Sequence, residues 1–446
     1  MRGKFTNQQL YRWMSSQIAE VYFRTYQLAL DQAKRAERTY QFELGLDAAT
    51  ASFVGTGYWD NLKKGLTAGD RLYHDLKRME IAYLNQNKRE FELTKHISLA
   101  LLNPLHLVEL RETGKCAFDL PEEIFDLDYP GHYFRRIKSV SLTLPCVVGP
   151  YTTISCTLRL LKNSIRINAT GAGYARKIDD DARFAENHIP VNAIAASNAQ
   201  NDSGVFELSF RDERYLPFEG AGAISNWSLE LFNDNSLDFG KALRQFDYST
   251  ISDAILHVKY TAREDAGEFK DEAVAHLRKY FAQNGTTPSL RMFNLRQEFP
   301  TQWQRFLNPT APASGNIFEL EMSPALFPFR DGGKKLKVNT IVLLARCANE
   351  KDYSVVLNPP LSAGSDKMTL TPDDKYGGLH FSQKPETVAA PALPPELGIT
   401  LDLTIPPKKW QFKMTNPDGQ NLRVDTKKQV MEVEDVILIL GYEWEE

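Results

Sequence analysis

The sequence has few or none of the features that define several common classes of protein. Its 446 residues include only four cysteines and no Cys-x-x-Cys pair, which excludes a disulfide scaffold. No run approaches the roughly 18 consecutive apolar residues of a membrane span, and the amino-terminal residues lack the apolar core of a secretory signal. A net charge of −4 gives no general attraction to nucleic acid or anionic membranes. Together these features predict a soluble protein, and the length predicts roughly two to four domains.

Catalytic and cofactor-binding motifs are missing as well. The sequence has no G-x-S-x-G elbow, no Walker lysine, no zinc-binding Cys/His spacing and no pair of histidines four apart on a predicted helix. Asp126 and Asp128 form a D-x-D, and residues 179–181 are all Asp, but neither has the Gly and Glu of an EF-hand loop, which favours solvated loops over a cation site. Among 57 acidic residues, no pair is singled out for glycoside hydrolysis. The sequence therefore predicts a non-enzymatic protein without cofactor or metal.

Residues 1–110 are predicted to form a helical hairpin. Thr6 and Gln9 have capping-box spacing, and the helical pattern then runs unbroken to about Leu46. The break at residues 55–57 precedes a second helix that is predicted to continue toward Leu102. A helix this long needs a neighbour for its apolar stripe, so the hairpin forms either the core of a globular domain or the end of an oligomeric coiled-coil stalk. The stripe consists of Leu10, Trp13, Met14, Ile18, Val21 and Tyr22.

From Ile137 onward, the apolar period changes from near 3.6 to 2, which predicts an antiparallel β-sandwich over residues 111–264. Cys146 and Cys156 continue the inward phase of two strands, so both are predicted to be buried thiols, and their pairing is left open. The alternating segments are residues 140–144, 154–160, 206–210, 227–231 and 254–260.

A short helical linker is predicted over residues 265–315, followed by a second sandwich over residues 316–446. The final strand, residues 435–442, matches residues 253–260 at Asp, Ile, Leu and Tyr. This match indicates that the last domain repeats the middle one. The predicted fold class is α+β: a long helical hairpin followed by two antiparallel β-sandwich domains joined by the helical linker.

Two loops are rich in the Tyr and Arg side chains that interfaces favour. We predict that they contact a partner; the alternative is a Tyr-rich domain seam with internal ion pairs. The predicted contact residues are Tyr129, His132, Tyr133, Arg135 and Arg136 in the first loop, and Arg211, Arg214, Tyr215 and Phe218 in the second.

At these loops the chain resembles a known family, the A component of ABC (Tc) insecticidal toxin complexes, in its C-terminal, B-component-binding region. The resemblance covers residues 4–264 in family order. It is carried by KFTNQQLYRWM (4–14), FELTKHISLALLNP (91–104), DLDYPGHYFRRIKSVSLTLPCVVGPY (126–151), NDSGVFELSFRDERYLPFEGAGAISNWSLEL (201–231) and DYSTISDAILHVKYTARE (247–264).

The resemblance implies a giant pore-forming virulence subunit that assembles as a homopentamer. Its C-terminal region docks onto the β-propeller of the B component, and docking opens a gate through which a toxic polypeptide enters the channel. Residues 1–110 then resemble the end of the channel-side helices, and residues 126–264 the B-component-binding sandwich. The receptor-binding shell and the channel tip have no counterpart here, so pore formation is not carried over. The implied location is a secreted or cell-surface toxin complex, associated with the host membrane in the intact assembly.

A carbohydrate-binding sandwich is the alternative function, because such folds stack sugars on exposed aromatic side chains. A host glycan would then be a partner. A glycoside hydrolase such as a sialidase has less support, because the repeated Asp-box strings of sialidases do not occur.

Overall fold

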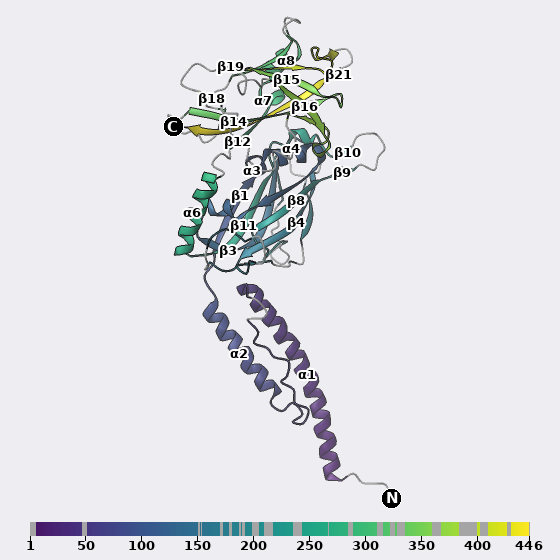
Figure 1. Ribbon diagram of the computed structural model, residues 1–446. Coiled ribbons are helices and arrows are strands. Elements are labelled where there is room, and N and C mark those ends of the chain that lie inside the picture. The colour runs from purple at the N-terminus through teal and green to yellow at the C-terminus, as the bar shows by residue number, and fades with distance from the viewer. Residues whose placement is uncertain are drawn as a thin grey trace. The chain divides into compact units, whose positions relative to one another are not determined.

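The protein is described here in a computed structural model and has a mixed α+β fold, with a long amino-terminal helix and several antiparallel sheets (Figure 1). No helix among the described residues is both long enough and apolar enough to span a membrane. The structure describes residues 6–46, 51–149, 152, 154–169, 173–177, 181–186, 189, 192–198, 205–208, 217–234, 243–265, 267–283, 289–309, 315–321, 326–327, 335–358, 367–382, 399–401, 409–425 and 430–445.

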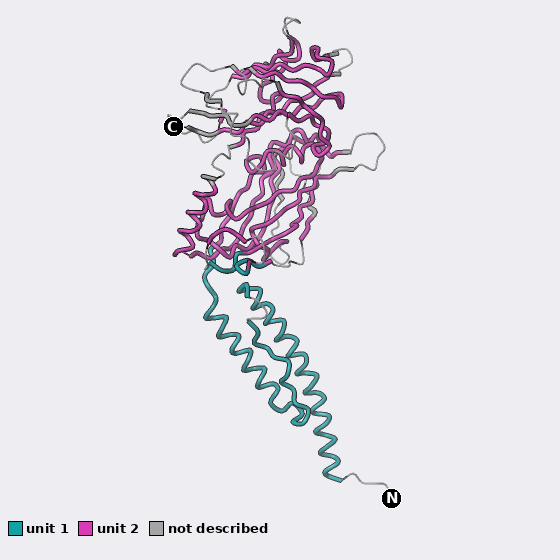
Figure 2. Tube along the Cα trace, in the orientation of Figure 1, with its two compact units in different colours: residues 1–91, 166–169, 182–185 teal, residues 92–165, 170–181, 186–446 magenta. Residues whose placement is uncertain are grey.

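The chain divides into two compact units, which we describe separately (Figure 2). The first contains residues 1–91, 166–169 and 182–185, and the second contains residues 92–165, 170–181 and 186–446. The predicted domain boundaries themselves stay predictions.

The first unit is built on helix α1 (Asn7–Leu44), and its capping is as predicted. The Thr6 hydroxyl accepts a hydrogen bond from the Gln9 amide at 3.3 Å, and the Gln9 side chain accepts one from the Thr6 amide at 2.9 Å. These two bonds satisfy backbone donors that have no partner within the helix. Gly45 ends the helix in the left-handed conformation, φ 68°.

The two helices of this unit run parallel, so the predicted hairpin is wrong for their direction. Near the start of α2 (Ala68–Gln86), the Gly69 amide donates to the Tyr22 hydroxyl at 3.1 Å. Near its end, Gln86 accepts from the Tyr40 hydroxyl at 2.9 Å. Residues later in α2 therefore meet residues later in α1.

The reason is the segment between them, residues 51–67, which runs back along α1. The Val54 amide donates to the Glu37 carboxylate at 2.8 Å, and the Trp59 ring packs against Phe23 with centroids 4.7 Å apart. Further on, Lys64 donates to the Ser15 hydroxyl at 2.8 Å. Extended chain advances about 3.3 Å per residue against 1.5 Å in a helix, so a short segment retraces a long stretch of α1.

The second helix also ends earlier than predicted, because residues 91–98 form strand β1 (Phe91–Ser98). Within it, Leu93 and Ile97 pack into the core of the second unit, and the strand joins a sheet beside β11. These two apolar residues are four positions apart, a spacing that fits one face of a helix or of a strand, and the pairing with β11 decides for the strand.

Two antiparallel sheets enclose the core of the first half of the second unit. One has the order β1-β11-β3-β7, and the other has β8 between β2 and β4, with β6 also on β4. Their inward side chains, among them Val140, Leu142, Leu256 and Trp227, form one hydrophobic cluster. The predicted period-2 segments thus lie in β3 (His132–Pro145), β4 (Ile154–Arg166), β7 (Val205–Leu208), β8 (Ile224–Leu231) and β11 (Ile255–Glu264).

Shorter elements complete this half and lead to the next. They are α3 (Leu99–Leu102), α4 (Pro104–Thr113), β2 (Lys115–Leu120), α5 (Glu122–Asp126), β6 (Ala193–Asn198), β9 (Asn233–Asp234), β10 (Leu243–Arg244), a 3-10 helix (Tyr248–Thr250) and α6 (Glu268–Gln283); the short strand β5 (Phe184–Ala185) belongs to the first unit. Cys146 and Cys156 are buried free thiols, as predicted, and burial raises the pKa of Cys146 to about 11 and that of Cys156 to about 12.

The second half contains a nine-stranded sheet of order β12-β22-β14-β17-β16-β15-β19-β13, with β18 on β14. Its elements are β12 (Ser289–Asn294), α7 (Leu295–Glu298), α8 (Pro300–Leu307), β13 (Asn316–Glu321), β14 (Lys335–Cys347), β15 (Tyr353–Asn358), β16 (Lys367–Asp373), a 3-10 helix (Asp374–Tyr376), β17 (Leu379–Phe381), β18 (Ile399–Leu401), β19 (Lys409–Thr415), β20 (Val424–Asp425), β21 (Val430–Met431) and β22 (Val433–Glu445).

The two halves share their strand pairing. Strand β11 lies between β1 and β3, as β22 lies between β12 and β14; β8 pairs with β2 and β4, as β19 pairs with β13 and β15; and β7 pairs with β3, as β17 pairs with β14. In each half the first strand leads into two short helices, and the second helix begins with a proline, Pro104 or Pro300. At the level of strand order, this supports the repeat indicated by residues 253–260 and 435–442.

Helix α4 is buried on two sides, and this joins the halves. Leu107 and Leu110 belong to the core of the first half, whereas Leu105 and Val108 pack against β14, β17 and β22 of the second. The equivalent helix α8 buries one face, with Trp303 and Phe306, and exposes polar residues such as Gln304 on the other. A helix with apolar residues on two faces, as in α4, requires cover on both, whereas a helix with one apolar face does not.

Candidate partner-binding site

The first predicted contact loop forms a tight turn, residues 127–131, between α5 and β3. Leu127 is 54% exposed and Tyr129 is 42% exposed, so two large apolar side chains face outward here. Asp128, between them, pairs with Lys95 of β1 at 2.7 Å. Gly131 has φ 87°, and a Cβ added there would meet Lys270 Cβ at 2.7 Å. The turn thus needs glycine at that position, because α6 passes close by.

The buried Arg135 side chain of β3 holds this turn in place. Its guanidinium is almost wholly buried and pairs with the buried Asp126 carboxylate, with Glu122 at 3.5 Å, and donates to the Tyr129 carbonyl at 3.2 Å. A buried arginine that satisfies two carboxylates and one carbonyl fixes the geometry of all three. The turn is therefore held from its helical side to its exposed tip by one side chain.

The neighbouring aromatic residues pack inward. His132 is buried and stacks under the Tyr129 ring, with centroids 5.3 Å apart and an interplanar angle of 24°. Burial lowers the pKa of His132, and the Arg135 charge lowers it further, which favours the neutral imidazole at pH 7. Tyr133 is buried against the Phe269 ring of α6, edge to face at 6.2 Å. The exposed tip thus rests on a packed aromatic layer.

Arg136 is also buried, and it packs against an unusual residue. Phe134 is fully buried and has φ 53°, a conformation that is costly for a residue with a side chain. The guanidinium carbon of Arg136 lies 4.8 Å from the Phe134 ring centroid, and that of Arg263 lies 3.8 Å from it. Cation–π contacts in a desolvated setting help to offset the cost of this backbone conformation.

The described end of the second predicted loop, residues 217–220, lies beside β3. The Gly220 amide donates to the Ile137 carbonyl at 2.8 Å, and the Ile137 amide donates to Ala221 at 2.7 Å. Phe218 has φ 65° and is buried edge-on against the Trp227 ring at 4.9 Å. The fold therefore brings this part of the second loop next to the first. Arg211, Arg214 and Tyr215 lie outside the described residues.

Of the predicted contact residues that the structure describes, Tyr129 is exposed, whereas His132, Tyr133, Arg135, Arg136 and Phe218 are buried. The internal ion pairs of Arg135 match the alternative of an ion-paired seam. Partner contact by these residues stays a prediction. Period-2 alternation could not separate the two interpretations, because residues 132–137 at the start of β3 are covered on both faces.

The sequence analysis did not predict the ion pairs that Asp126 and Asp128 form. Asp126 faces Arg135 and Asp128 faces Lys95, so the two carboxylates serve separate ion pairs. Lys95, which lies 33 positions before Asp128, was not singled out, and nothing in its local sequence marks it. Within the described part of the chain, no group of three or more His, Cys, Asp or Glu side chains is arranged to hold a metal ion.

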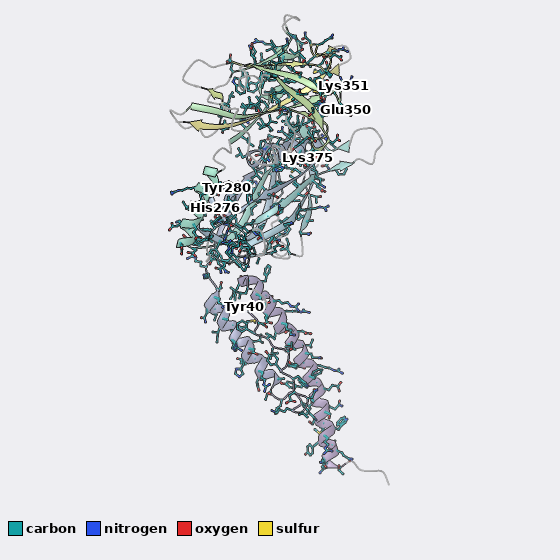
Figure 3. All side chains as sticks on the ribbon, in the orientation of Figure 1. Tyr40, His276, Tyr280, Glu350, Lys351 and Lys375 are labelled. Carbon is teal, nitrogen blue, oxygen red and sulfur yellow. The ribbon has the colours of Figure 1, made fainter. Side chains whose placement is uncertain are left out.

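Helix α6 adds a second aromatic cluster beside the turn. The Tyr174 ring stacks on Phe269 at 5.7 Å and lies 4.6 Å from the His276 ring. His276 Nε2 lies 3.1 Å from the Glu123 carboxylate, which ties α6 to α5. Figure 3 labels His276 and Tyr280 on α6. These contacts hold α6, the helix that lies close to Gly131, in its position.

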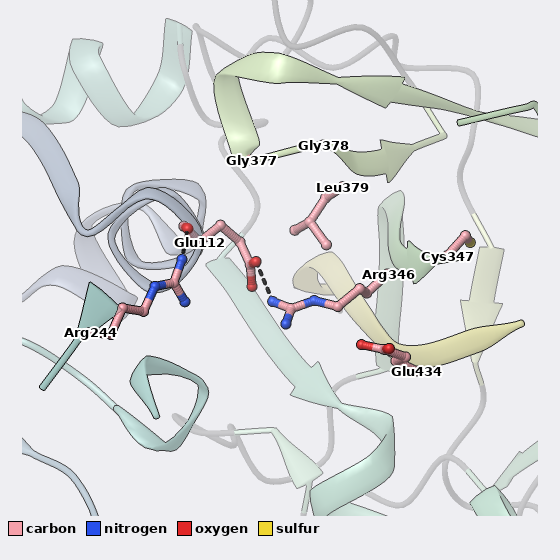
Figure 4. Close-up of a pocket in the computed structure, with 8 residues that line it drawn as sticks. All are labelled: Glu112, Arg244, Arg346, Cys347, Gly377, Gly378, Leu379 and Glu434. Carbon is pink, nitrogen blue, oxygen red and sulfur yellow. Dashed lines mark hydrogen bonds and ion pairs between the residues drawn. The ribbon is translucent and has the colours of Figure 1, made fainter. Parts of the chain in front are cut away.

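A cavity of about 440 Å³ lies beside the carboxyl end of α4 (Figure 4). Its two arginines both hold this helix end: Arg346 pairs with the Glu112 carboxylate, and Arg244 donates to the Arg111 carbonyl at 3.3 Å. Cations suit a helix carboxyl terminus, so these charges serve the junction between the halves. The lining residues are Glu112, Arg244, Arg346, Cys347, Gly377, Gly378, Leu379 and Glu434.

Comparison with known proteins gives one family. Residues 1–262 match the family model described as the Tc toxin complex TcA C-terminal TcB-binding domain. Toxin subunit YenA2 of Yersinia entomophaga is 40% identical over 275 residues, which are 60% of this chain and 19% of that subunit. The chain thus spans about a fifth of the length of this relative.

Two solved structures are also similar to part of the chain. Morganella morganii TcdA4 is 27% identical, with a TM-score of 0.40, over 58% of this chain and 11% of that one. Yersinia pseudotuberculosis TcaA-TcaB is 26% identical, with a TM-score of 0.41, over 58% of this chain and 14% of that one.

Proposed function

Because the chain belongs to the family of TcB-binding domains found at the C-terminus of the TcA component of Tc toxin complexes, we propose that it docks the B-component β-propeller onto the TcA translocation channel. The proposal concerns protein–protein docking, with no catalytic step. The B component is the protein partner that the family description implies.

We place the docking surface at the 127–131 turn. Leu127 and Tyr129 supply exposed apolar area, and Tyr is among the residue types that carry binding energy at interfaces. The buried Arg135 ion pairs support the same turn, so little conformational entropy is lost when it binds. Exposed apolar side chains on a rigid turn are the observation that carries this proposal. His132, Tyr133, Arg135, Arg136 and Phe218 act by positioning, and partner contact by Arg211, Arg214 and Tyr215 stays a prediction from the sequence.

The experiment is the affinity of the chain for the B component encoded beside it, measured by biolayer interferometry. Tyr129→Ala and Leu127→Ala are each expected to weaken binding by about tenfold or more. Truncating a side chain that becomes buried in the interface costs about 1–2 kcal/mol or more of binding free energy. Tyr73→Ala, at an exposed tyrosine of α2, is the matched control. Unchanged affinity in both turn variants would remove the turn from the docking surface. A folded chain that binds no B component but captures glycans on an array would favour the carbohydrate-binding alternative.

We also propose that the intact protein is a homopentamer in which α1 lies at the end of the channel helices. Trp13 and Ile18 of its apolar stripe are 62% and 66% exposed within one chain, and other copies would cover them. The two sheets of the first half would act as one sandwich-like docking module. The complex would be a secreted or cell-surface toxin that reaches the host membrane. Light scattering of the chain alone and with the B component would test the stoichiometry.

A further inference from the structure

We propose that His96 and His257 form a binding site for a divalent transition-metal ion of the zinc class. The two histidines lie 161 positions apart in the sequence and meet on neighbouring strands, β1 and β11. This site is independent of the docking function proposed above.

The ring geometry supports chelation. The Nδ1 atoms lie 2.5 Å apart, and the rings are nearly perpendicular, with centroids 4.7 Å apart and an interplanar angle of 77°. Two imidazoles bound to one tetrahedral zinc at about 2.0–2.1 Å hold their ligating nitrogens about 3.3 Å apart. Widening the present separation by less than 1 Å is within reach of small χ rotations of two surface side chains. His96 is exposed and His257 is half-buried, so solvent reaches the site.

The other nitrogen of His257 is held as it would be in a metal site. Its Nε2 lies 2.8 Å from the Thr143 hydroxyl of β3. A metal-bound histidine usually donates its second N–H to a neighbouring oxygen, which fixes the tautomer and leaves the opposite lone pair for the metal. In the tautomer whose Nε2 donates its proton to Thr143, the His257 lone pair is on Nδ1, the atom that faces His96.

The strands beneath these side chains are rigid. Opposite His257 on β3 is Ser141, and the inward neighbours Leu142, Leu256 and Val258 are buried in the core. The outward face of the sheet carries the two imidazoles, and the buried face fixes their backbones. Ligands presented from a packed sheet lose little entropy on binding a metal.

The structural repeat gives a second reason to assign function to this face. His96 stands two residues before the cap Ser98, as Met292 stands two before Asn294, and His257 stands four residues after Asp253, as Ile439 stands four after Asp435. In the second half, Met292 and Ile439 are paired on an apolar face that packs against α4. At the same positions the first half carries two histidines in contact. The face that packs against a helix in one half is thus replaced by a pair of metal ligands in the other.

The site has two protein ligands. Among the described residues, no group of three His, Cys, Asp or Glu comes together, so the two imidazoles are the ligands proposed here. Imidazole ligands suit zinc, nickel and copper over magnesium or calcium. The ion would bind with its remaining positions open to solvent.

The test is a titration of the full chain with Zn²⁺, measured by isothermal titration calorimetry. One ion per chain is expected, with affinity reduced at least about tenfold in His96→Gln and in His257→Gln. Thr143→Val should weaken binding by about 10–100-fold, as loss of a supporting hydrogen bond to a metal ligand does. His74→Gln, at an exposed histidine of α2, is the matched control and should bind like the wild type. Affinity should fall at acid pH, since protons compete with the metal for the same lone pairs.

A second measurement distinguishes metal binding from a hydrogen bond in which the His96 and His257 imidazoles share one proton. Zinc should shift the imidazole ¹⁵N resonances of His96 and His257 together at fixed pH, and leave those of His74 in place. Equal zinc affinity in wild type, His96→Gln and His257→Gln would overturn the proposal, as would unshifted imidazole resonances at saturating zinc. Should His257→Gln fail to fold, the exposed His96→Gln carries the test.

Discussion

Asp253 and Asp435 hold equivalent positions in the two halves of the second unit, and each links the start of a long strand to the cap of a short helix. Asp253 accepts from the Ala254 amide at 2.7 Å and from the hydroxyl of Ser98, the cap of α3, at 2.5 Å. Asp435 accepts from the Val436 amide at 2.8 Å and from the side chain of Asn294, the cap of α7, at 3.0 Å.

Asp253→Ala is expected to lower the free energy of unfolding by about 1–3 kcal/mol. The substitution leaves the Ser98 hydroxyl and the Ala100 and Ala254 amides without their acceptor, and unsatisfied partly buried donors carry that cost. Urea unfolding followed by circular dichroism measures the change. Glu350→Ala removes an exposed carboxylate and should shift the midpoint little. Equal midpoints for both variants would contradict the role of Asp253.

Asp435→Asn should change the pH dependence of stability. Burial raises the pKa of Asp435 in the folded chain. A carboxyl with a raised folded pKa favours folding when it is protonated, and this contribution is lost as pH rises through the folded pKa. The free energy of unfolding of Asp435→Asn, relative to that of the wild type, should therefore rise as the pH increases from about 3.9, the pKa of an aspartate in the unfolded chain, to pH 7. Unfolding curves at several pH values measure this; a stability difference that does not change with pH would refute it.

Arg135→Met is expected to cost about 3–5 kcal/mol, because it removes the arginine that pairs with the buried Asp126 carboxylate. The turn should also loosen, with faster amide hydrogen exchange over residues 127–131. The double variant Arg135→Met, Asp126→Leu removes the Asp126 charge together with the arginine, so the loss should be smaller. A double variant less stable than Arg135→Met would show that the ion pair is not the source of the cost.

Glu37→Ala should release residues 52–54 from α1. The Glu37 carboxylate accepts from the Ser52 hydroxyl at 3.3 Å, from the Phe53 amide, and from the Val54 amide at 2.8 Å. Hydrogen exchange at those amides should speed up by about tenfold or more, since each lost bond to a charged group is worth about 1.5–3 kcal/mol. Glu20→Ala, on an exposed part of the same helix, is the control, because its ion pair with Arg24 lies in solvent. Unchanged protection at Phe53 and Val54 would contradict this role.

Local patterns in the sequence determined a large part of the secondary structure. The Thr6–Gln9 capping box, the long first helix and the period-2 strands depend on neighbours a few residues away, and each is present. The match between residues 253–260 and 435–442 also carried real information, because β11 and β22 have equivalent partners. Backbone conformation follows from such short-range preferences when the whole segment agrees.

The tertiary structure alone decided the rest. The direction of α2 depends on residues 51–67 packing along α1, and the burial of Arg135 and Arg136 depends on β3 being covered on both faces. His96 and His257 meet only because their strands pair across 161 positions. Contacts between residues far apart in the chain arise from packing and strand order, and no short window of sequence contains both partners.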